Sequence, residues 1–185
     1  MSSHKSFRAA SAVALAAVVA WPVAVLAQQG PGLGQPISAA DIAPWDISIG
    51  TDGQGLPPGS GKAKDGETIY VAKCQSCHGV DGAGQPADRL VGGQGTIDKL
   101  DQVRTVGSYW PYATTIFDYV RRTMPFNTPE TLTNDEAYAL TAYLLYKNGI
   151  IKQNYEINAR TLPRVRMPNR DGFIMMYPPG AKGSQ

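Results

Sequence analysis

The two cysteines of the chain, Cys74 and Cys77, lie in the segment VAKCQSCHGV, and His78 follows the second directly. A Cys-x-x-Cys pair can form a redox disulfide of the thioredoxin type, but that motif opens a helix after a β-strand and needs no histidine. On a helix, two thiols three residues apart face the same way, and the adjacent imidazole reaches a metal from that side. The spacing therefore predicts two covalent anchors and one axial ligand for a single haem c.

The second axial ligand of such an iron must come from elsewhere in the chain. The other histidine, His4, lies in a leader segment, which leaves four candidates: Met124, Met167, Met175 and Met176. Pro125 disfavours helical backbone at Met124 and places its sulfur on a loop between two expected helices. Met167 also precedes a proline but lies beyond the last expected helix. The pattern favours Met124, with Met167 or an open site as alternatives and core filling as the competing use of a methionine.

Ligation by histidine and methionine fills both axial positions and raises the reduction potential. Such a haem passes electrons and binds neither oxygen nor substrate. The chain by itself is therefore predicted to transfer electrons rather than to act as an enzyme.

Three further side chains are candidate haem contacts. Trp110 and Tyr112 can pack on the ring or bond a propionate, or can simply be core aromatics. Arg121 can pair with a propionate through its guanidinium fork, or can lie at a solvated helix end. Gly79, Gly82 and Gly84 superficially resemble a phosphate loop, but they follow the Cys-x-x-Cys-His motif rather than a strand, so nucleotide binding is not expected.

The first residues have the pattern of an export signal. His4, Lys5 and Arg8 are followed by an apolar run, and Val25-Leu26-Ala27 forms a small-residue cleavage site. We expect residues 1–27 to be cleaved and the mature chain to be periplasmic, without a membrane span. The alternative is an uncleaved anchor helix, because the apolar run is just long enough to cross a bilayer.

Charge argues against nucleic-acid binding. The chain has 17 basic and 15 acidic residues, and loss of Lys5 and Arg8 with the leader leaves 15 of each. Nucleic-acid binders normally show a basic excess. Residues 153–185 are nevertheless basic, which suggests a docking surface or a simple surface wrap.

The helical spacing of apolar residues predicts a small all-α domain over residues 62–152. Residues 28–61 and 153–185 are rich in Gly or Pro and read as irregular arms, with one short strand or strap at Trp45, Ile47 and Ile49. A weak pattern at Thr96–Val103 suggests one more short helix.

The positions and ends of three helices follow from periodicity and capping signals. The first is expected from Asp65, as N-cap, to Cys77. The second covers Tyr112–Arg122. The third begins with a capping box of Thr133 and Glu136 and stops at Asn148-Gly149.

With these residues identified, the domain resembles class I cytochromes c. The matching parts are Gly66 and Tyr70 on the first helix, the Cys-x-x-Cys-His motif, Met124-Pro125, and Tyr143 on the last helix. The resemblance implies a fold in which the first and last helices cross at the glycine, with aromatic side chains packed there.

Four segments make the resemblance narrower. IGTDGQGLPPGSG, TVGSYWPYATTIFDYVRRTMP, LTNDEAYALTAYLLYKNGII and RTLPRVRMPNRDGF are similar to the cytochrome subunits of periplasmic sulfane dehydrogenases of thiosulfate-oxidising systems and of related sulfite dehydrogenases. The similarity covers Trp45 to Phe173 and so includes parts of both arms. Some of those subunits carry two haem motifs, whereas this chain has one.

The resemblance implies a division of labour between subunits. A molybdenum-containing partner would oxidise the sulfur compound by two electrons, and the haem of this chain would accept them one at a time and pass them to another c-type cytochrome. Two alternatives from other classes stay open. One is a free periplasmic electron shuttle, and the other is a haem sensor whose methionine is displaced by a ligand.

Overall fold

The structure is a computed structural model and describes residues 33–174. The expected leader at 1–27 and the candidate ligands Met175 and Met176 lie outside the described residues. The chain divides into two units, Met1–Ile42 and Ala43–Gln185. The first contains α2 (Ala39–Ile42), a single turn in which the Asp41 carboxylate accepts from the backbone and hydroxyl of Ser38.

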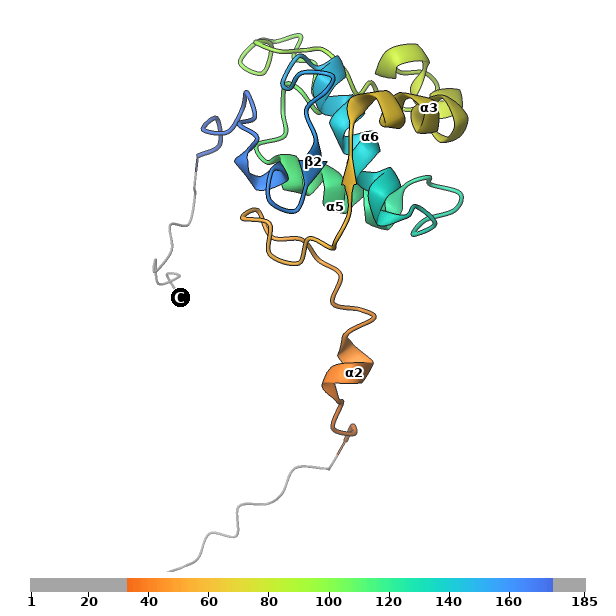
Figure 1. The fold of residues 1–185 in the computed structure, drawn as a ribbon. Coiled ribbons are helices and arrows are strands. Elements are labelled where there is room, and N and C mark those ends of the chain that lie inside the picture. The colour runs from red at the N-terminus through yellow and green to blue at the C-terminus, as the bar shows by residue number, and fades with distance from the viewer. Residues whose placement is uncertain (1–32, 175–185) are drawn as a thin grey trace, which may run out of the picture. The chain divides into compact units, whose positions relative to one another are not determined.

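The other described elements belong to the second unit (Figure 1). Its helices are α3 (Ala63–Lys73), α4 (Gln75–His78), α5 (Ala113–Thr123) and α6 (Asn134–Lys147), with two 3-10 turns, η1 (Val80–Gly82) and η2 (Leu162–Arg164). The strands are β1 (Ser60–Gly61) and β2 (Ile157–Asn158). The all-α prediction is confirmed, since only two short strands accompany the described helices.

The start and the end of the first helix differ from the prediction. The helix begins at Ala63 after Lys62, whose backbone is extended, so Asp65 is not its N-cap but an acidic residue in its first turn, where it complements the helix dipole. The helix also stops before Cys74, at φ −123° and ψ −34°, and α4 starts anew at Gln75. The Cys74 carbonyl then accepts from the backbone N–H groups of both Cys77 and His78.

The other two long helices agree with the sequence patterns. Tyr112 precedes α5 in extended conformation, and the helix ends at Thr123. The Thr133 hydroxyl accepts from the Glu136 N–H while the Glu136 carboxylate accepts from the Thr133 N–H, which confirms the capping box of α6. Helix α6 ends before Asn148, and Gly149 follows with φ +70°.

Helices α3 and α6 cross at backbone contact. A Cβ on Gly66 would lie 2.0 Å from the carbonyl oxygen of Ala139, so only glycine allows this approach. One turn further along α3, the ring of Tyr70 packs on that of Tyr143 with centroids 5.0 Å apart. The expected crossing of first and last helices at a glycine is therefore present (Figure 1).

Helix α5 packs on α6 and forms the other part of the helical core. Phe117 and Tyr138, both fully buried, pack with ring centroids 4.3 Å apart and join α5 to α6. Helix α6 is buried along most of its length because α3, α5 and β1 surround it.

Residues 49–61 are fastened to the helices by polar contacts. Asp118 accepts from the Ile49 N–H at 3.2 Å, and the Tyr138 hydroxyl donates to the Pro57 carbonyl at 2.8 Å. Trp45 is exposed and no strand forms at Trp45–Ile49, where the Ile49 N–H donates to the Asp118 side chain rather than to a neighbouring strand. The segment is a strap without strand structure.

The second arm contributes to the core. Its buried residues are Ile157, Leu162, Val165 and Met167. Strand β2 pairs antiparallel with β1, with Gly61 opposite Ile157, so the two arms meet in a two-residue ladder. Sequence periodicity does not reveal this ladder, because two residues carry no alternation.

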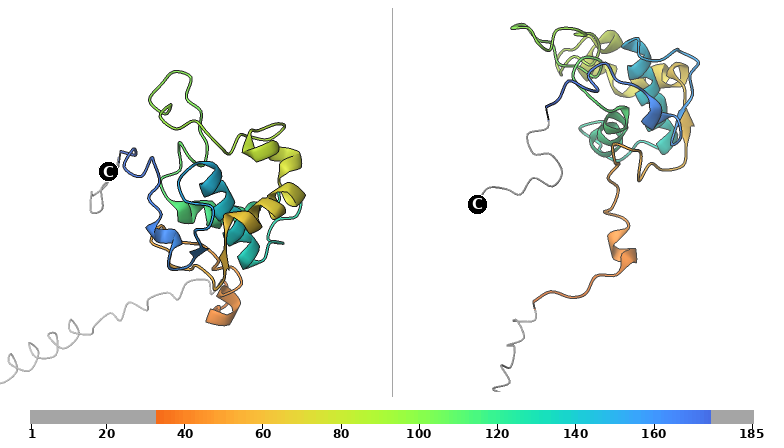
Figure 2. Two further views of the ribbon diagram at one scale, coloured as in Figure 1. Left: turned by 45° about the horizontal axis from the view of Figure 1, so that its top comes forward. Right: turned by 90° about the vertical axis from the view of Figure 1, so that its left-hand side faces the viewer.

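The long connection between η1 and α5 projects from the helices (Figure 2). The weakly expected helix at Thr96–Val103 is absent there. Instead the Thr96 hydroxyl donates to the Gly93 carbonyl and accepts from the Val103 N–H, so a hydroxyl-bonded turn replaces helical hydrogen bonds. Among residues 33–174, no helix is both long enough and apolar enough to cross a membrane.

The contact at Gly66 predicts a large effect of one added methyl group. We expect Gly66→Ala to lower the free energy of unfolding by about 1–3 kcal/mol, because α3 and α6 must move apart. Urea denaturation measures this, and Thr68→Ala, an exposed change on the same helix, serves as the control. A loss below about 0.5 kcal/mol for Gly66→Ala contradicts the close contact.

The ion pair between Lys73 of α3 and Glu136 of α6 predicts a pH-dependent contribution to stability. The two side chains approach to 2.6 Å, and the hydrogen bond from Lys73 lowers the pKa of Glu136 below its ordinary value of 4.5. The contribution is therefore complete above pH 4.5 and is lost as the pH falls through the lowered pKa.

We expect Glu136→Gln, which preserves the capping box, to cost about 0.2–1 kcal/mol at pH 7 and nothing in strong acid. Thermal unfolding across this pH range measures the difference. A cost that is independent of pH assigns the effect to packing instead.

Candidate haem site

The two cysteines lie where α3 ends and α4 begins. Cys74 is partly buried and packs against the hydrophobic core, whereas Cys77 is exposed. Burial raises the pKa of the Cys74 thiol to about 11. The motif follows helix α3 rather than a strand, so the thioredoxin-type interpretation, which places the motif after a strand, receives no support.

His78 is held in one tautomer by the backbone. Its Nδ1 lies 2.9 Å from the carbonyl oxygen of Asp88. Because a carbonyl only accepts hydrogen bonds, Nδ1 carries the proton and the lone pair resides on Nε2. A metal-ligating histidine needs this arrangement, in which the second ring nitrogen is fixed by an acceptor.

The segment after His78 turns back on itself. Gly79 and Gly82 both have positive φ, and a Cβ on Gly79 would lie 2.4 Å from the Gly84 carbonyl oxygen. The Gly84 N–H donates to the His78 carbonyl and the Ala87 N–H donates to that of Cys77. The loop therefore returns directly over the motif and delivers the Asp88 carbonyl to the imidazole.

Met124 is the residue at which α5 stops. Its N–H still closes the last helical turn on Val120, but its own backbone is extended, with φ −116° and ψ 146°. The side chain is partly exposed. This agrees with the expected effect of Pro125 and leaves the thioether on a loop, whereas Met167 is 1% exposed inside the core.

Trp110 and Tyr112 lie at the other end of α5 from Met124. Trp110 packs on the core and meets the ring of Tyr119 edge-on, with centroids 5.8 Å apart. The ring of Tyr112 lies 4.0 Å from the guanidinium carbon of Arg170. Both aromatic rings therefore have contacts within the protein, and their role as haem contacts stays a prediction.

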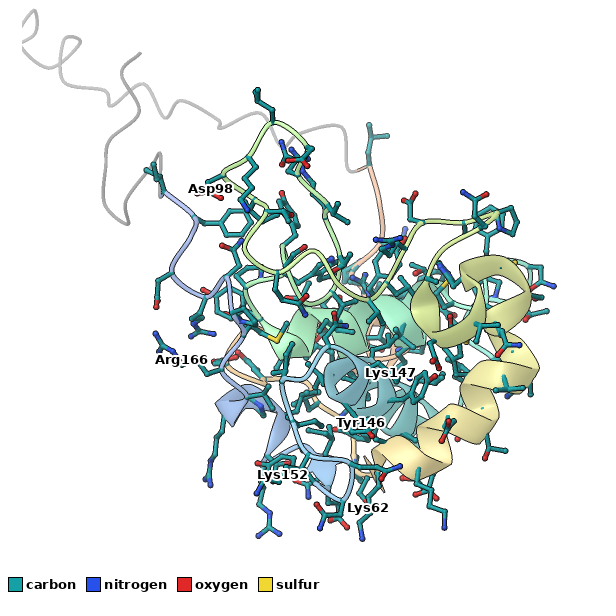
Figure 3. All side chains as sticks on the ribbon, turned by 90° about the horizontal axis from the view of Figure 1, so that it is seen from above. Lys62, Asp98, Tyr146, Lys147, Lys152 and Arg166 are labelled. Carbon is teal, nitrogen blue, oxygen red and sulfur yellow. The ribbon has the colours of Figure 1, made fainter. Side chains whose placement is uncertain are left out.

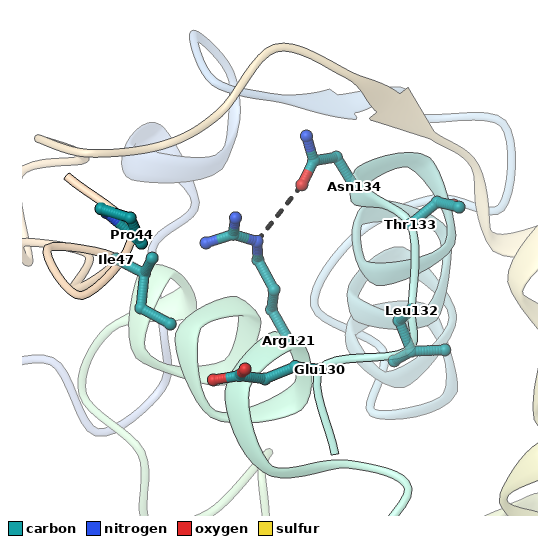
Figure 4. A pocket seen from close by; sticks show the side chains of 7 residues that line it. All are labelled: Pro44, Ile47, Arg121, Glu130, Leu132, Thr133 and Asn134. Atoms are coloured by element: carbon teal, nitrogen blue, oxygen red, sulfur yellow. Dashed lines mark hydrogen bonds between the residues drawn. The ribbon is translucent and has the colours of Figure 1, made fainter. Parts of the chain in front are cut away.

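Arg121 faces a small cavity of about 460 Å³ (Figure 4). Its Nε donates to the Asn134 side chain of α6 at 3.2 Å. The cavity is lined by the strap residues Pro44 and Ile47 and by the connection between α5 and α6. The guanidinium is thus engaged with α6, and a propionate partner for it also stays a prediction.

Asn148 holds this region together, although the sequence marks it only as part of a helix end. The Asn148 side chain donates to the carbonyls of Leu90 and Leu144 and accepts from the Gly92 N–H at 3.0 Å. It thereby fastens the return of the loop to the end of α6. Sequence reasoning identified Asn148 only as part of a helix stop.

The donors present suit an attached group better than a bare ion. Among residues 33–174, no three His, Cys, Asp or Glu side chains gather as a metal-ion site would require. Two thiols for covalent attachment, one imidazole with a free Nε2 and a thioether on a loop are instead the kinds of side chain that a haem c uses, the first two as anchors and the other two as iron ligands.

Comparison with known proteins supports this assignment. The family described as cytochrome c oxidase, cbb3-type, subunit III, matches residues 61–144. No match was found among curated proteins.

A solved structure extends the similarity beyond that range. The chain is 41% identical to a chain in the crystal structure of the sulfane dehydrogenase SoxCD from Paracoccus pantotrophus, with a TM-score of 0.73. The match covers 78% of this chain and 71% of that chain. It is therefore wider than the segment matched by the family above.

Proposed function

The chain belongs to the class I c-type cytochromes related to the sulfane dehydrogenase SoxCD, and on this basis we propose that it is the electron-accepting subunit of a sulfur-oxidising molybdenum dehydrogenase. Electron transfer is the function of the cytochrome domain itself. The observation that carries the finer proposal is the 41% identity to SoxCD across a span that exceeds the haem domain.

We assign one haem c to this chain, which would be attached through Cys74 and Cys77 and would take His78 and Met124 as its iron ligands. When bound, haem c supplies a one-electron iron couple. The Asp88 carbonyl keeps the proton of His78 on Nδ1 and so leaves Nε2 to bind iron. As a ligand, the thioether of Met124 would favour the ferrous state.

The partner subunit would oxidise the sulfur compound by two electrons, as the resemblance to sulfane and sulfite dehydrogenases implies. This chain accepts those electrons singly and passes them to another c-type cytochrome. Both cysteines are committed to haem, so the molybdenum site belongs to the partner. The leader pattern at residues 1–27 and the haem attachment motif together support a periplasmic location.

A free electron shuttle is the second candidate, and one observation favours it. Ordered arms would indicate a bound subunit if their side chains could be buried only against a partner protein. Here residues 49–61 and 157–167 are instead packed on the helices of the same chain. The arms alone therefore do not require a partner.

The metal content of the native complex separates the two functions. The protein, isolated gently from its periplasm, is expected to co-purify with a larger chain and about one molybdenum per haem iron. Iron alone on a monomer refutes the subunit proposal and leaves the shuttle.

The ligand assignment is tested by two methionine variants. We expect Met124→Ala to open the iron to carbon monoxide and to lower the reduction potential, because the thioether is lost. We expect Met167→Ala to leave spectrum and potential unchanged and to destabilise the fold by about 2–5 kcal/mol, because it empties a buried site. The opposite pattern transfers the ligand role to Met167.

A further inference from the structure

Two tyrosines from different helices carry their hydroxyl groups to the segment directly after His78. Tyr70 of α3 donates to the Gly79 carbonyl at 2.9 Å, and Tyr143 of α6 donates to Oδ1 of Asp81 at 3.1 Å. Burial raises the pKa of both hydroxyl groups, that of Tyr70 to about 12. Both therefore remain hydrogen-bond donors over the physiological range.

Asp81 is held from two sides although half of its side chain is exposed. Lys147, which lies on α6 (Figure 3), approaches Oδ2 to 2.8 Å, and its ammonium also lies 5.9 Å from the centroid of the Tyr143 ring. The backbone of Asp81 is left-handed, with φ +57°, a conformation that Asp and Asn adopt more readily than most residues. The carboxylate thus fixes a tight turn to α6.

Backbone hydrogen bonds connect this turn to the segment that carries Asp88, whose carbonyl is the hydrogen-bond partner of His78. The carbonyl of Gly82, the next residue, accepts from the N–H groups of Leu90 at 2.9 Å and Val91 at 3.2 Å. These bonds close the loop two residues after Asp88. The Asp88 carbonyl, which accepts from Nδ1 of His78, is therefore placed by a loop whose base is fastened at Asp81.

We propose that Tyr143, Asp81 and Lys147 form a positioning unit that holds the Asp88 carbonyl on His78 and thereby tunes the haem iron. The proposal rests on the axial role of His78 stated above. A fixed acceptor on the second ring nitrogen makes a histidine a stronger donor to its metal, which favours ferric iron. The three residues act through the loop and are not ligands.

The test uses Tyr143→Phe, Asp81→Asn and Lys147→Met in the haem-loaded protein. At one fixed ambient potential, we expect each variant to raise the ratio of ferrous to ferric protein. For Tyr143→Phe the rise is about fivefold, the equivalent of one ordinary hydrogen bond. We also expect faster solvent exchange of the Nδ1 proton, measured by NMR on the reduced protein.

The charges of the variants separate positioning from simple electrostatics. Asp81→Asn removes a negative charge, Lys147→Met removes a positive one, and Tyr143→Phe removes none. Electrostatics alone would shift the ratio in opposite directions for the first two and leave Tyr143→Phe unchanged. That pattern overturns the proposal, whereas a shift in one direction for all three supports it.

Tyr138→Phe is the matched control. Tyr138 also lies on α6 and is fully buried. Its hydroxyl donates to the Pro57 carbonyl in the N-terminal arm rather than to the loop that follows His78. We expect Tyr138→Phe to lose about as much stability as Tyr143→Phe, with no change in the ratio of ferrous to ferric protein or in the solvent exchange of the His78 Nδ1 proton. An equal shift in Tyr138→Phe assigns the effect to general loosening and refutes the positioning role. A wild-type spectrum without histidine ligation refutes the proposed function instead, before any variant is compared.

Discussion

The backbone contact between α3 and α6 is the constraint on which the rest of the structure depends. Gly66 has no Cβ, so α3 approaches Ala139 closely enough for Tyr70 and Tyr143 to stack beside the crossing. Those two tyrosines then point their hydroxyl groups at Gly79 and Asp81, which follow His78. The helix crossing that builds the core thus also orients the loop that follows the candidate ligand His78, because the same buried rings serve both purposes.

The arms complete the core that α3, α5 and α6 form. Ile157, Leu162 and Met167 fill it from one side, while residues 49–61 are hydrogen-bonded along α5 and α6. A domain of this size buries limited apolar area, so extensions that add buried side chains stabilise it. The similarity to the SoxCD chain covers 78% of this chain, which agrees with arms that belong to the fold.

The candidate ligands come from structurally different places. His78 lies in a loop that returns over its own motif, so its acceptor is fixed by local backbone hydrogen bonds. Met124 lies where a proline ends α5, so the position of its sulfur depends on how α5 packs against α6. One candidate ligand is therefore held by a loop that local backbone hydrogen bonds shape and that α6 fastens at Asp81, and the other by the packing of α5 on α6.

Local chemistry in the sequence determined the Cys-x-x-Cys-His motif, the helical character of the domain, the capping box of α6, and the loop position of Met124. Each of these depends on residues within a few positions of one another. Only the tertiary structure decided the break at Cys74, the acceptor role of Asp88, the bonds of Tyr143 and Lys147 to Asp81, and the docking of both arms. These features join residues that are far apart in the sequence or rest on backbone carbonyls, which every residue possesses and which therefore leave no signal in residue type.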